Sequence, residues 1–146
     1  MSNIKIRHNG YPHLFPSDDW LEAQKSIPLK QRLLEYIYFK RAVTFAELEA
    51  YFGDEFKGTK ELGFPEFNIV VWPNVSERFA KTFMELEHEG LISKYIGPMS
   101  ILGYFHDCKV LSLPIAKRQY KYKSLRWMPV LLNPTDKCRE LVVDDE

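Results

Sequence analysis

The chain has 146 residues, of which 45% are hydrophobic and 14% aromatic, a composition that predicts one folded domain and excludes a disordered chain. No apolar run approaches the roughly 18 residues of a membrane helix, and the first residues lack the apolar core of a secretory signal, so we expect a cytoplasmic protein without a membrane segment. The net charge of zero disfavours a protein that binds a polyanion with its whole surface.

An irregular N-terminal arm and one long helix are predicted first. Glycine and proline interrupt residues 1–25, which predicts an arm whose only regular element is a short turn capped by Asp18 or Asp19. Apolar residues at positions i, i+4, i+7 and i+8 predict the first helix over Pro28–Arg41. A proline at its start is compatible with a helix, because the N–H that proline lacks would have no partner there.

A shorter second helix is predicted next. Thr44 and Glu47 form a capping box, in which each side chain accepts a hydrogen bond from the backbone N–H of the other residue. Gly53 ends this helix, because glycine adopts a positive φ without strain. Residues 54–73 then form a long connection that contains the strand-like run Phe67–Trp72.

The clearest pattern in the sequence predicts a third helix that leads directly into a strand. The helix is expected over Val75–Glu89, with Asn74 as its N-cap and Glu77 in its first turn, because its apolar residues lie within about 80° on a helical wheel. Gly90 ends the helix, and Leu91–Ile96 alternates like a strand.

Strands are expected over most of the remaining chain. Ile101–Phe105, Lys109–Leu113 and Gln119–Leu132 contain short apolar runs or alternating patterns. The acidic residues 141–146 are expected to form a frayed tail. Because the sequence contains no internal repeat and no low-complexity tract, we assign residues 1–146 to a single domain.

The order of these elements resembles the winged helix-turn-helix superfamily. That order is a helix, a capped helix, a longer helix ending in Glu89-Gly90-Leu91-Ile92, and then strands. The resemblance implies an α+β fold with a three-helix core and a small antiparallel β-sheet, and a function in DNA binding and transcription regulation. The connection 54–73 is far longer than the turn of about 3–4 residues that joins the helices of this motif, so we interpret it as an insertion.

The third helix provides the first candidate contacts with DNA. In a helix-turn-helix protein the N-terminal residues of the recognition helix contact base edges in the major groove. The residues expected to reach bases or phosphates are Asn74, Ser76, Arg78 and Lys81. The alternative is an ordinary amphipathic helix with a solvated face, because the same helix also carries four glutamates.

A basic strip in the last third of the chain provides the second candidate contacts. Residues 108–135 contain six basic residues and no acidic one. As a β-hairpin wing this strip would hold phosphate groups, and its aromatic residues can stack on unpaired bases. The expected contacts are Lys117, Arg118, Lys121, Lys123 and Arg126. The alternative is an edge strand whose lysines prevent pairing with other chains.

No pattern in the sequence indicates catalysis, a metal or a cofactor. Cys108 and Cys138 lack the spacing of metal ligands, and we expect two free thiols. The neighbouring residues His106 and Asp107 would point to opposite sides of a strand, so they cannot converge on one ion. We therefore expect that the protein is not an enzyme and that it has no catalytic, metal-binding or cofactor-binding residue.

Double-stranded DNA is the expected partner, and a protein-interaction module on a winged-helix scaffold without DNA binding is the alternative. A homodimer is a second expectation, because winged helices commonly bind paired half-sites as dimers. Four aromatic residues are interpreted as core, with a dimer surface as the alternative. They are Trp20, Phe64, Phe67 and Trp72.

Overall fold

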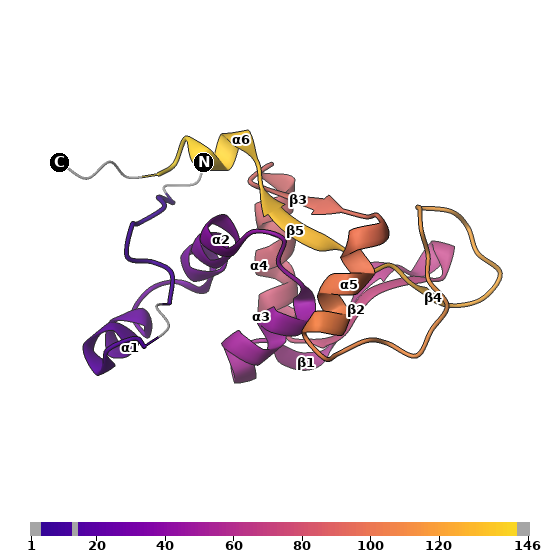
Figure 1. Cartoon of the computed structure of the whole chain (residues 1–146), viewed down its shortest axis with the longest axis horizontal. Helices are drawn as coiled ribbons and strands as arrows, with labels where there is room; N and C mark the ends of the chain where they lie inside the picture. Colours follow the sequence, from indigo (N-terminus) through magenta and orange to yellow (C-terminus); the bar gives the residue numbers. More distant parts are fainter. Residues whose placement is uncertain (1–3, 13–14, 143–146) are drawn as a thin grey trace. The chain divides into compact units, whose positions relative to one another are not determined.

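The computed structural model describes residues 4–12 and 15–142 and has a mixed α+β fold, which confirms the predicted class (Figure 1). The chain divides into two compact units. Unit 1 comprises Met1–Arg41, Thr82–Ser93 and Asn133–Glu146, and unit 2 comprises Ala42–Lys81 and Lys94–Leu132. Each helix in the described part of the chain is too short or too polar to cross a lipid bilayer.

Unit 1 contains helices from both ends of the chain, namely α1 (Asp18–Gln24), α2 (Leu29–Lys40) and α6 (Asp136–Arg139). The predicted first helix is confirmed by α2. The cap of α1 is Ser17, whose Oγ accepts a hydrogen bond from Trp20 N–H at 3.1 Å, so the prediction of Asp18 or Asp19 was wrong. Serine and aspartate cap equally well, and the sequence pattern could not choose among adjacent candidates.

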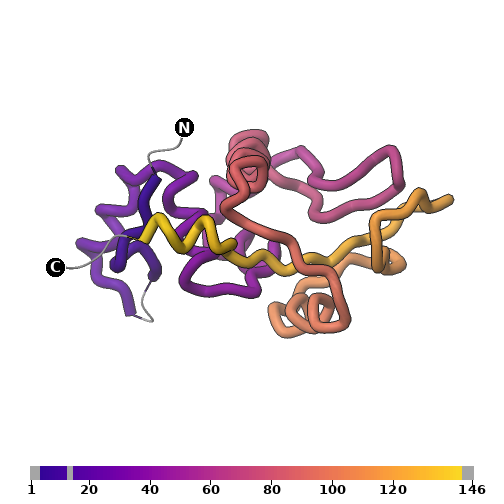
Figure 2. The backbone as a smooth tube through the Cα atoms, turned by 90° about the horizontal axis from the view of Figure 1, so that it is seen from above, coloured from indigo at the N-terminus to yellow at the C-terminus, as the bar shows by residue number. Residues whose placement is uncertain are grey.

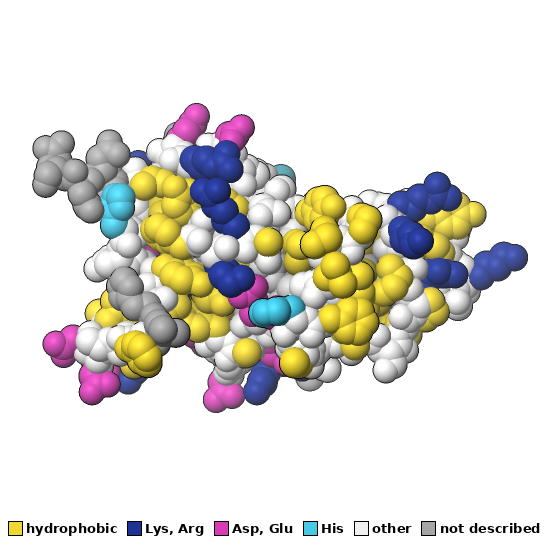
Figure 3. Space-filling model, viewed as in Figure 1, with side chains coloured by type: hydrophobic (Ala, Val, Ile, Leu, Met, Phe, Trp, Pro, Cys, Tyr) yellow, Lys and Arg dark blue, Asp and Glu magenta, His cyan; other side chains and the backbone are white. Residues whose placement is uncertain are grey.

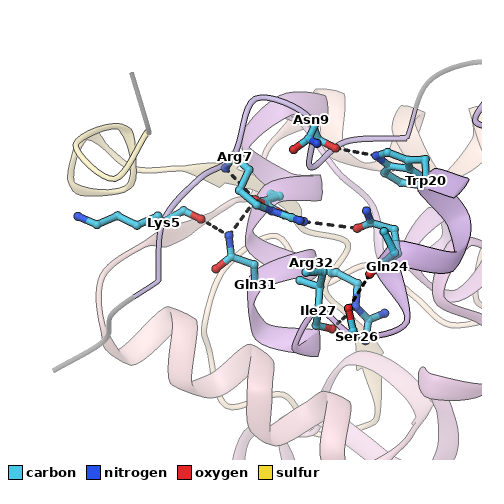
Figure 4. A network of polar contacts seen from close by, with 11 residues as sticks. Lys5, Arg7, Asn9, Trp20, Gln24, Ser26, Ile27, Gln31 and Arg32 are labelled. Atoms are coloured by element: carbon cyan, nitrogen blue, oxygen red, sulfur yellow. Dashed lines mark hydrogen bonds and ion pairs between the residues drawn. The ribbon is translucent and has the colours of Figure 1, made fainter. Parts of the chain in front are cut away.

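A buried ion pair joins the N-terminal segment to α2 within unit 1, as part of the polar network drawn in Figure 4. The carboxylate of Glu35 is fully buried, and its Oε1 accepts a hydrogen bond from Arg7 Nη2 at 2.6 Å. Its Oε2 accepts from the backbone N–H and the Nε of Arg7, and from Gln31 Nε2, each at 2.8 Å. This hydrogen bonding raises the pKa of Arg7 above its ordinary value. Arg7 thus compensates a charge that is costly to bury alone.

The two ends of the described chain pair with each other. Ile6 forms a parallel bridge with Val142, and its N–H donates to the Leu141 carbonyl at 2.8 Å. Leu141 and Val142 are therefore held in place, and the prediction of a frayed tail was wrong for these two residues. Residues 143–146 of that tail, and residues 1–3, 13 and 14 of the predicted arm, lie outside the described residues.

Unit 2 begins with the predicted capped helix, α3 (Phe45–Phe52). Both hydrogen bonds of the capping box are present: Thr44 Oγ1 accepts from Glu47 N–H at 3.0 Å, and Glu47 Oε1 accepts from Thr44 N–H at 3.1 Å. Gly53 has a φ of 56°, as its predicted role at the helix end requires. A short 3₁₀ turn, η1 (Gly53–Glu55), follows.

The predicted insertion folds as a β-hairpin. β1 (Lys57–Phe64) and β2 (Ile69–Val75) are antiparallel, and η2 (Pro65–Phe67) with Asn68 joins them. β2 also pairs in parallel with β4 (Arg126–Trp127), so the sheet β1-β2-β4 is mixed, and the predicted all-antiparallel sheet was wrong. A parallel pair joins strands that are distant in sequence, which a local pattern cannot reveal.

The predicted unit of a third helix and a strand is confirmed. α4 (Glu77–His88) begins in unit 2 and ends in unit 1. Gly90 has a φ of 75°, and Leu91 N–H donates to the Leu86 carbonyl at 3.1 Å, which ends the helix. β3 (Ile92–Tyr95) follows and pairs with β5 (Leu131–Pro134). The apolar stripe of the helix is buried, namely Phe79, Phe83 and Leu86.

The strand prediction for Ile101–Phe105 was wrong, because this segment lies in helix α5 (Pro98–His106). Pro98 occupies the first helical position, and Ser100 Oγ donates to the Gly97 carbonyl at 2.7 Å. A short apolar run fits a strand and a helix equally well. The other two strand predictions were wrong over most of their residues. Lys109–Leu113 contains no strand, and Gln119–Leu132 contains only β4 and the start of β5.

Aromatic rings form the centre of unit 2. Tyr104 lies between two tryptophans, with ring centroids 5.4 Å from Trp72 and 5.0 Å from Trp127. Its hydroxyl donates to the Val130 carbonyl at 2.8 Å and accepts from Phe45 N–H at 3.1 Å, and burial raises its pKa. Trp72 is fully buried, which confirms its assignment to the core. The other three aromatic residues assigned to the core are half-buried, namely Trp20, Phe64 and Phe67.

Candidate nucleic-acid interface

One of the predicted DNA contacts, Ser76, forms hydrogen bonds at the start of α4. Ser76 Oγ accepts a hydrogen bond from Phe79 N–H at 3.0 Å and donates to the Glu55 carbonyl at 2.6 Å. The Ser76 carbonyl accepts from Ala80 N–H at 2.9 Å, which makes Ser76 the N-cap. The prediction of Asn74 as the cap was therefore wrong. Asn74 is an exposed residue of β2 with a φ of 58°.

Two residues near the start of α4 point to solvent. Arg78 is 65% exposed, and its Nη1 lies 3.6 Å from Oε2 of Glu55, so part of its charge is compensated within the chain. Lys81 is also exposed. An exposed ion pair of this kind is weak, so a phosphate can compete for Arg78. The helix therefore offers Arg78 and Lys81, and of the four predicted contacts it brings only these two to one exposed turn.

Four of the five residues of the second predicted set lie on one loop of unit 2, residues 117–125, which we call the basic loop, and the fifth, Arg126, begins β4. Figures 1 and 2 both show the basic loop beside the turn of the β1–β2 hairpin. Three hydrogen bonds fix it there: Tyr122 N–H donates to the Phe67 carbonyl at 3.1 Å, Asn68 Nδ2 donates to the Tyr122 carbonyl at 2.8 Å, and Arg126 N–H donates to the Asn68 carbonyl at 2.8 Å. The loop is irregular, but it is anchored.

The prediction that this segment forms a β-hairpin wing was wrong. The described chain from residue 117 to residue 125 contains no strand, and β4 begins only at Arg126. Alternation of polar and apolar residues forms a strand when one set is buried. Here the apolar set has no core to cover, since Tyr120 is 53% and Leu125 is 45% exposed.

The cations of the basic loop are exposed and uncompensated. Lys117, Arg118, Lys121 and Lys123 are all exposed, and none of the four forms an ion pair with another described residue. No acidic residue occurs anywhere between residues 108 and 135. Figure 3 shows Lys and Arg side chains gathered where Figure 1 draws the basic loop. Positive charge without a partner in the described part of the chain is therefore concentrated at this loop.

Cations and aromatic rings alternate along the basic loop and into β4. The guanidinium of Arg118 lies 5.0 Å from the ring centroid of Tyr120, and that of Arg126 lies 4.7 Å from the ring of Tyr122. The two tyrosine rings meet edge to face, with centroids 5.2 Å apart. Arg126 also donates from Nη1 to the Ile115 carbonyl at 3.1 Å. Arg126 thus has a structural role at the start of β4, while Tyr120 and the cations of the basic loop are accessible.

The described residues contain no group of three or more His, Cys, Asp or Glu side chains that could hold a metal ion. His106 and Asp107 lie at the end of α5, where His106 Nδ1 is 3.1 Å from Asp107 Oδ1. Asp107 also accepts a hydrogen bond from the Thr44 hydroxyl. These contacts attach the end of α5 to the cap of α3.

The role of Glu55 beside the predicted recognition helix was not predicted from the sequence. Glu55 forms an ion pair with Arg78, and its carbonyl accepts from Ser76. No local signal pointed to this contact, because it depends on the path of the hairpin between α3 and α4. Helix α5 was not predicted either, although Pro98 directly after Gly97 is a recognisable helix start.

Comparisons of the chain with protein-family models, with curated proteins and with solved structures found no match.

Proposed function

We propose that this chain is a small DNA-binding protein that contacts the phosphate backbone with its basic loop. The observation that carries the proposal is the set of four exposed cations in a segment without any acidic residue. Nucleic-acid affinity depends chiefly on such local charge and not on net charge. The proposed contacts are Lys117, Arg118, Lys121 and Lys123.

The absence of a strand in the basic loop strengthens this proposal. Lysines on an edge strand have a simple explanation, since they prevent the edge from pairing with other chains. Residues 117–125 are not a strand, so that explanation does not apply to them. Binding of a polyanion is then the interpretation that accounts for both the number and the exposure of the cations.

The arrangement of helices supports a winged-helix scaffold and a role in transcription regulation in the cytoplasm. α2, α3, α4 and β3 follow one another in the order of that fold, with the β1–β2 hairpin inserted between its second and third helices. In this scaffold α4 is the recognition helix, and Arg78 and Lys81 are its contacts with DNA. α5 occupies the position in the chain where the second strand of a wing is expected.

The proposal is tested by charge reversal in the basic loop. A Lys121→Glu/Lys123→Glu variant is compared with a Lys57→Glu/Lys60→Glu variant, which changes the net charge equally but alters exposed residues of β1. Binding to a fluorescent random duplex of about 20 base pairs is measured at about 50 mM salt. We expect the loop variant to bind at least about tenfold more weakly, and the control variant to bind nearly as well as the wild type.

Equal losses in the two variants would mean that net charge, and not the basic loop, determines binding. No measurable binding of the wild-type chain at low salt would contradict the proposal itself.

Tyr120 allows duplex and single-stranded DNA to be distinguished. Its ring is 53% exposed and lies beside the Arg118 guanidinium, so it can stack on an unpaired base but not on a base inside a duplex. A Tyr120→Ala variant should lose about 1–3 kcal/mol of affinity for an oligothymidine, which is about 5- to 160-fold, and little for the duplex. Parallel titrations of both ligands measure the difference, and equal effects would show that Tyr120 does not stack on bases.

A further inference from the structure

Helix α5 exposes three of its large apolar side chains to solvent. Its fully buried residues are Ser100 and Tyr104. Met99, Leu102 and Phe105 are 59%, 51% and 61% exposed. A surface helix of a monomeric protein normally has the opposite arrangement, with its apolar face on the core. The outer face of α5 is therefore unlike a surface that remains in contact with water.

The three exposed side chains form one stripe. They are spaced by three residues, so at about 100° per residue they lie within about 120° of each other on the helix. Figure 3 shows hydrophobic side chains gathered over the region where Figure 1 draws α5. Apolar residues in the segments before and after the helix extend the patch, namely Tyr95, Ile96 and Val110. Contiguous apolar patches of this kind mark interaction sites.

A pocket of about 440 Å³ borders this stripe. Pro98 and Ile101 of α5 form one side of it, and Ile115 and Ala116 form another. Its lining is almost entirely apolar, and the only charged residue in that lining is Lys117, the first cation of the basic loop. A ligand that enters the pocket therefore needs an apolar group, and it meets a positive charge at the edge.

We propose that α5 and this pocket bind an amphipathic helix of another protein, with acidic residues along one edge of its apolar face. A partner helix lies along α5, with apolar side chains against Leu102 and Phe105 and one side chain in the pocket. Spacings of three and four residues on two helices interdigitate in this way. The acidic edge contacts Lys117 and the neighbouring cations of the basic loop. This interaction goes beyond the DNA contacts proposed above.

A second copy of the chain fits this surface less well than an acidic partner. In a symmetric dimer each α5 would face the other α5, which would bring two basic loops together at one interface. Other helices in the described part of the chain offer no complementary stripe, because α1, α3 and α4 each expose only one large apolar residue. These residues are Leu21, Tyr51 and Met84.

The proposal is tested with the full chain and synthetic peptides of about 18 residues, or about five helical turns. The first peptide has a leucine stripe with glutamates beside it, the second has the same stripe with lysines, and the third has the glutamate composition in scrambled order. Fluorescence anisotropy should detect micromolar binding of the first peptide alone. Comparable binding of the lysine or the scrambled peptide overturns the proposal.

Substitutions on α5 locate the site. A Leu102→Ser/Phe105→Ser variant should bind the glutamate peptide at least about tenfold more weakly. A matched Phe15→Ser/Leu21→Ser variant, which changes exposed apolar residues far from α5 in sequence, should bind it like the wild type. Because neither variant changes a cation of the basic loop, DNA binding should be unchanged in both. A failure of peptide binding at α5 can therefore be distinguished from a failure of the proposed DNA binding.

A measurement on the wild-type chain keeps the test independent of the folding of the variants. In NMR titrations the glutamate peptide should shift the amide signals of α5 and of Ile115 first. Shifts confined to other parts of the chain overturn the proposal. Two further results overturn the proposal. If sedimentation shows a dimer of the chain that the α5 substitutions abolish, the occupant is a second copy. If the chain binds anionic lipid vesicles and the same substitutions abolish this binding, the occupant is a membrane.

Discussion

The buried carboxylate of Glu35 depends on one cation, and this dependence can be measured. In an Arg7→Met variant Glu35 keeps the hydrogen bonds from the backbone N–H of residue 7 and from Gln31, each at 2.8 Å, but has no charge partner among the described residues. We expect the free energy of unfolding to fall by about 3–5 kcal/mol, because an uncompensated charge stays buried. An Arg7→Met/Glu35→Met double variant should recover most of this loss. Urea denaturation of the wild type, the single variant and the double variant measures the free energy of unfolding. A double variant less stable than Arg7→Met would contradict the expectation.

Cys138 makes stability depend on pH in the alkaline range. The thiol is fully buried in α6, and burial raises its pKa from 9.0 to about 11. Between these values the unfolded chain has released the proton and the folded chain has not, so the free energy of unfolding falls as pH rises. At about 1.4 kcal/mol per pKa unit this loss approaches about 2 kcal/mol by pH 11.

A Cys138→Ala variant lacks this contribution and is the reference. Denaturation curves of both proteins, recorded between about pH 8 and 11 under reducing conditions, should converge as pH rises, with the wild type losing more stability. Contributions from all other groups are the same in both proteins and cancel in the difference. Curves that stay parallel would mean that the thiol is accessible to water in the folded state.

At the scale of single elements, the start of α4 gives the sharpest prediction. Ser76 makes two hydrogen bonds with its hydroxyl, whereas Asn74 lies in β2 at a positive φ. We expect Ser76→Ala to lower the free energy of unfolding by about 1–2 kcal/mol. Asn74→Gly should change it by less than about 0.5 kcal/mol, because glycine adopts a positive φ without strain. Thermal and chemical denaturation measure both losses of stability. A larger loss for Asn74→Gly than for Ser76→Ala would mean that Asn74 is the cap.

The elements that could be predicted are those specified by neighbouring residues. α3 was correctly predicted because the Thr44–Glu47 capping box and the stop at Gly53 are local features. α5 was missed because a nine-residue apolar helix and a strand share the same composition over so short a length. The failure of the wing has a different cause: residues 117–125 alternate correctly, but no core lies beneath them to bury one face.

The candidate site was predicted in part for the same reasons. The cations of the basic loop were found because charge composition is visible in the sequence without knowledge of the backbone. The ion pair between Arg78 and Glu55, and the pocket between α5 and Ile115, were not found because each joins segments that only the folded chain brings together. Composition thus identified the charged surface, and the fold was needed to find the apolar one.

For the molecule as a whole, zero net charge and a positively charged loop make opposite predictions about DNA binding. A neutral chain with evenly mixed charges should show little dependence on salt. The four cations of the basic loop, if each displaces a counterion from duplex DNA, contribute about −3.6 to the slope of log K against log salt. Replacing Lys121 and Lys123 with glutamine should reduce the magnitude of that slope by about 1.8 and weaken binding to all duplex sequences alike. Replacing Lys57 and Lys60 of β1 with glutamine changes the net charge equally and should leave the slope as it is. Titrations of one duplex between about 25 and 200 mM salt measure the slope for the wild type and both variants. An equal change of slope in both variants would mean that DNA binds to the whole charged surface and not to the basic loop.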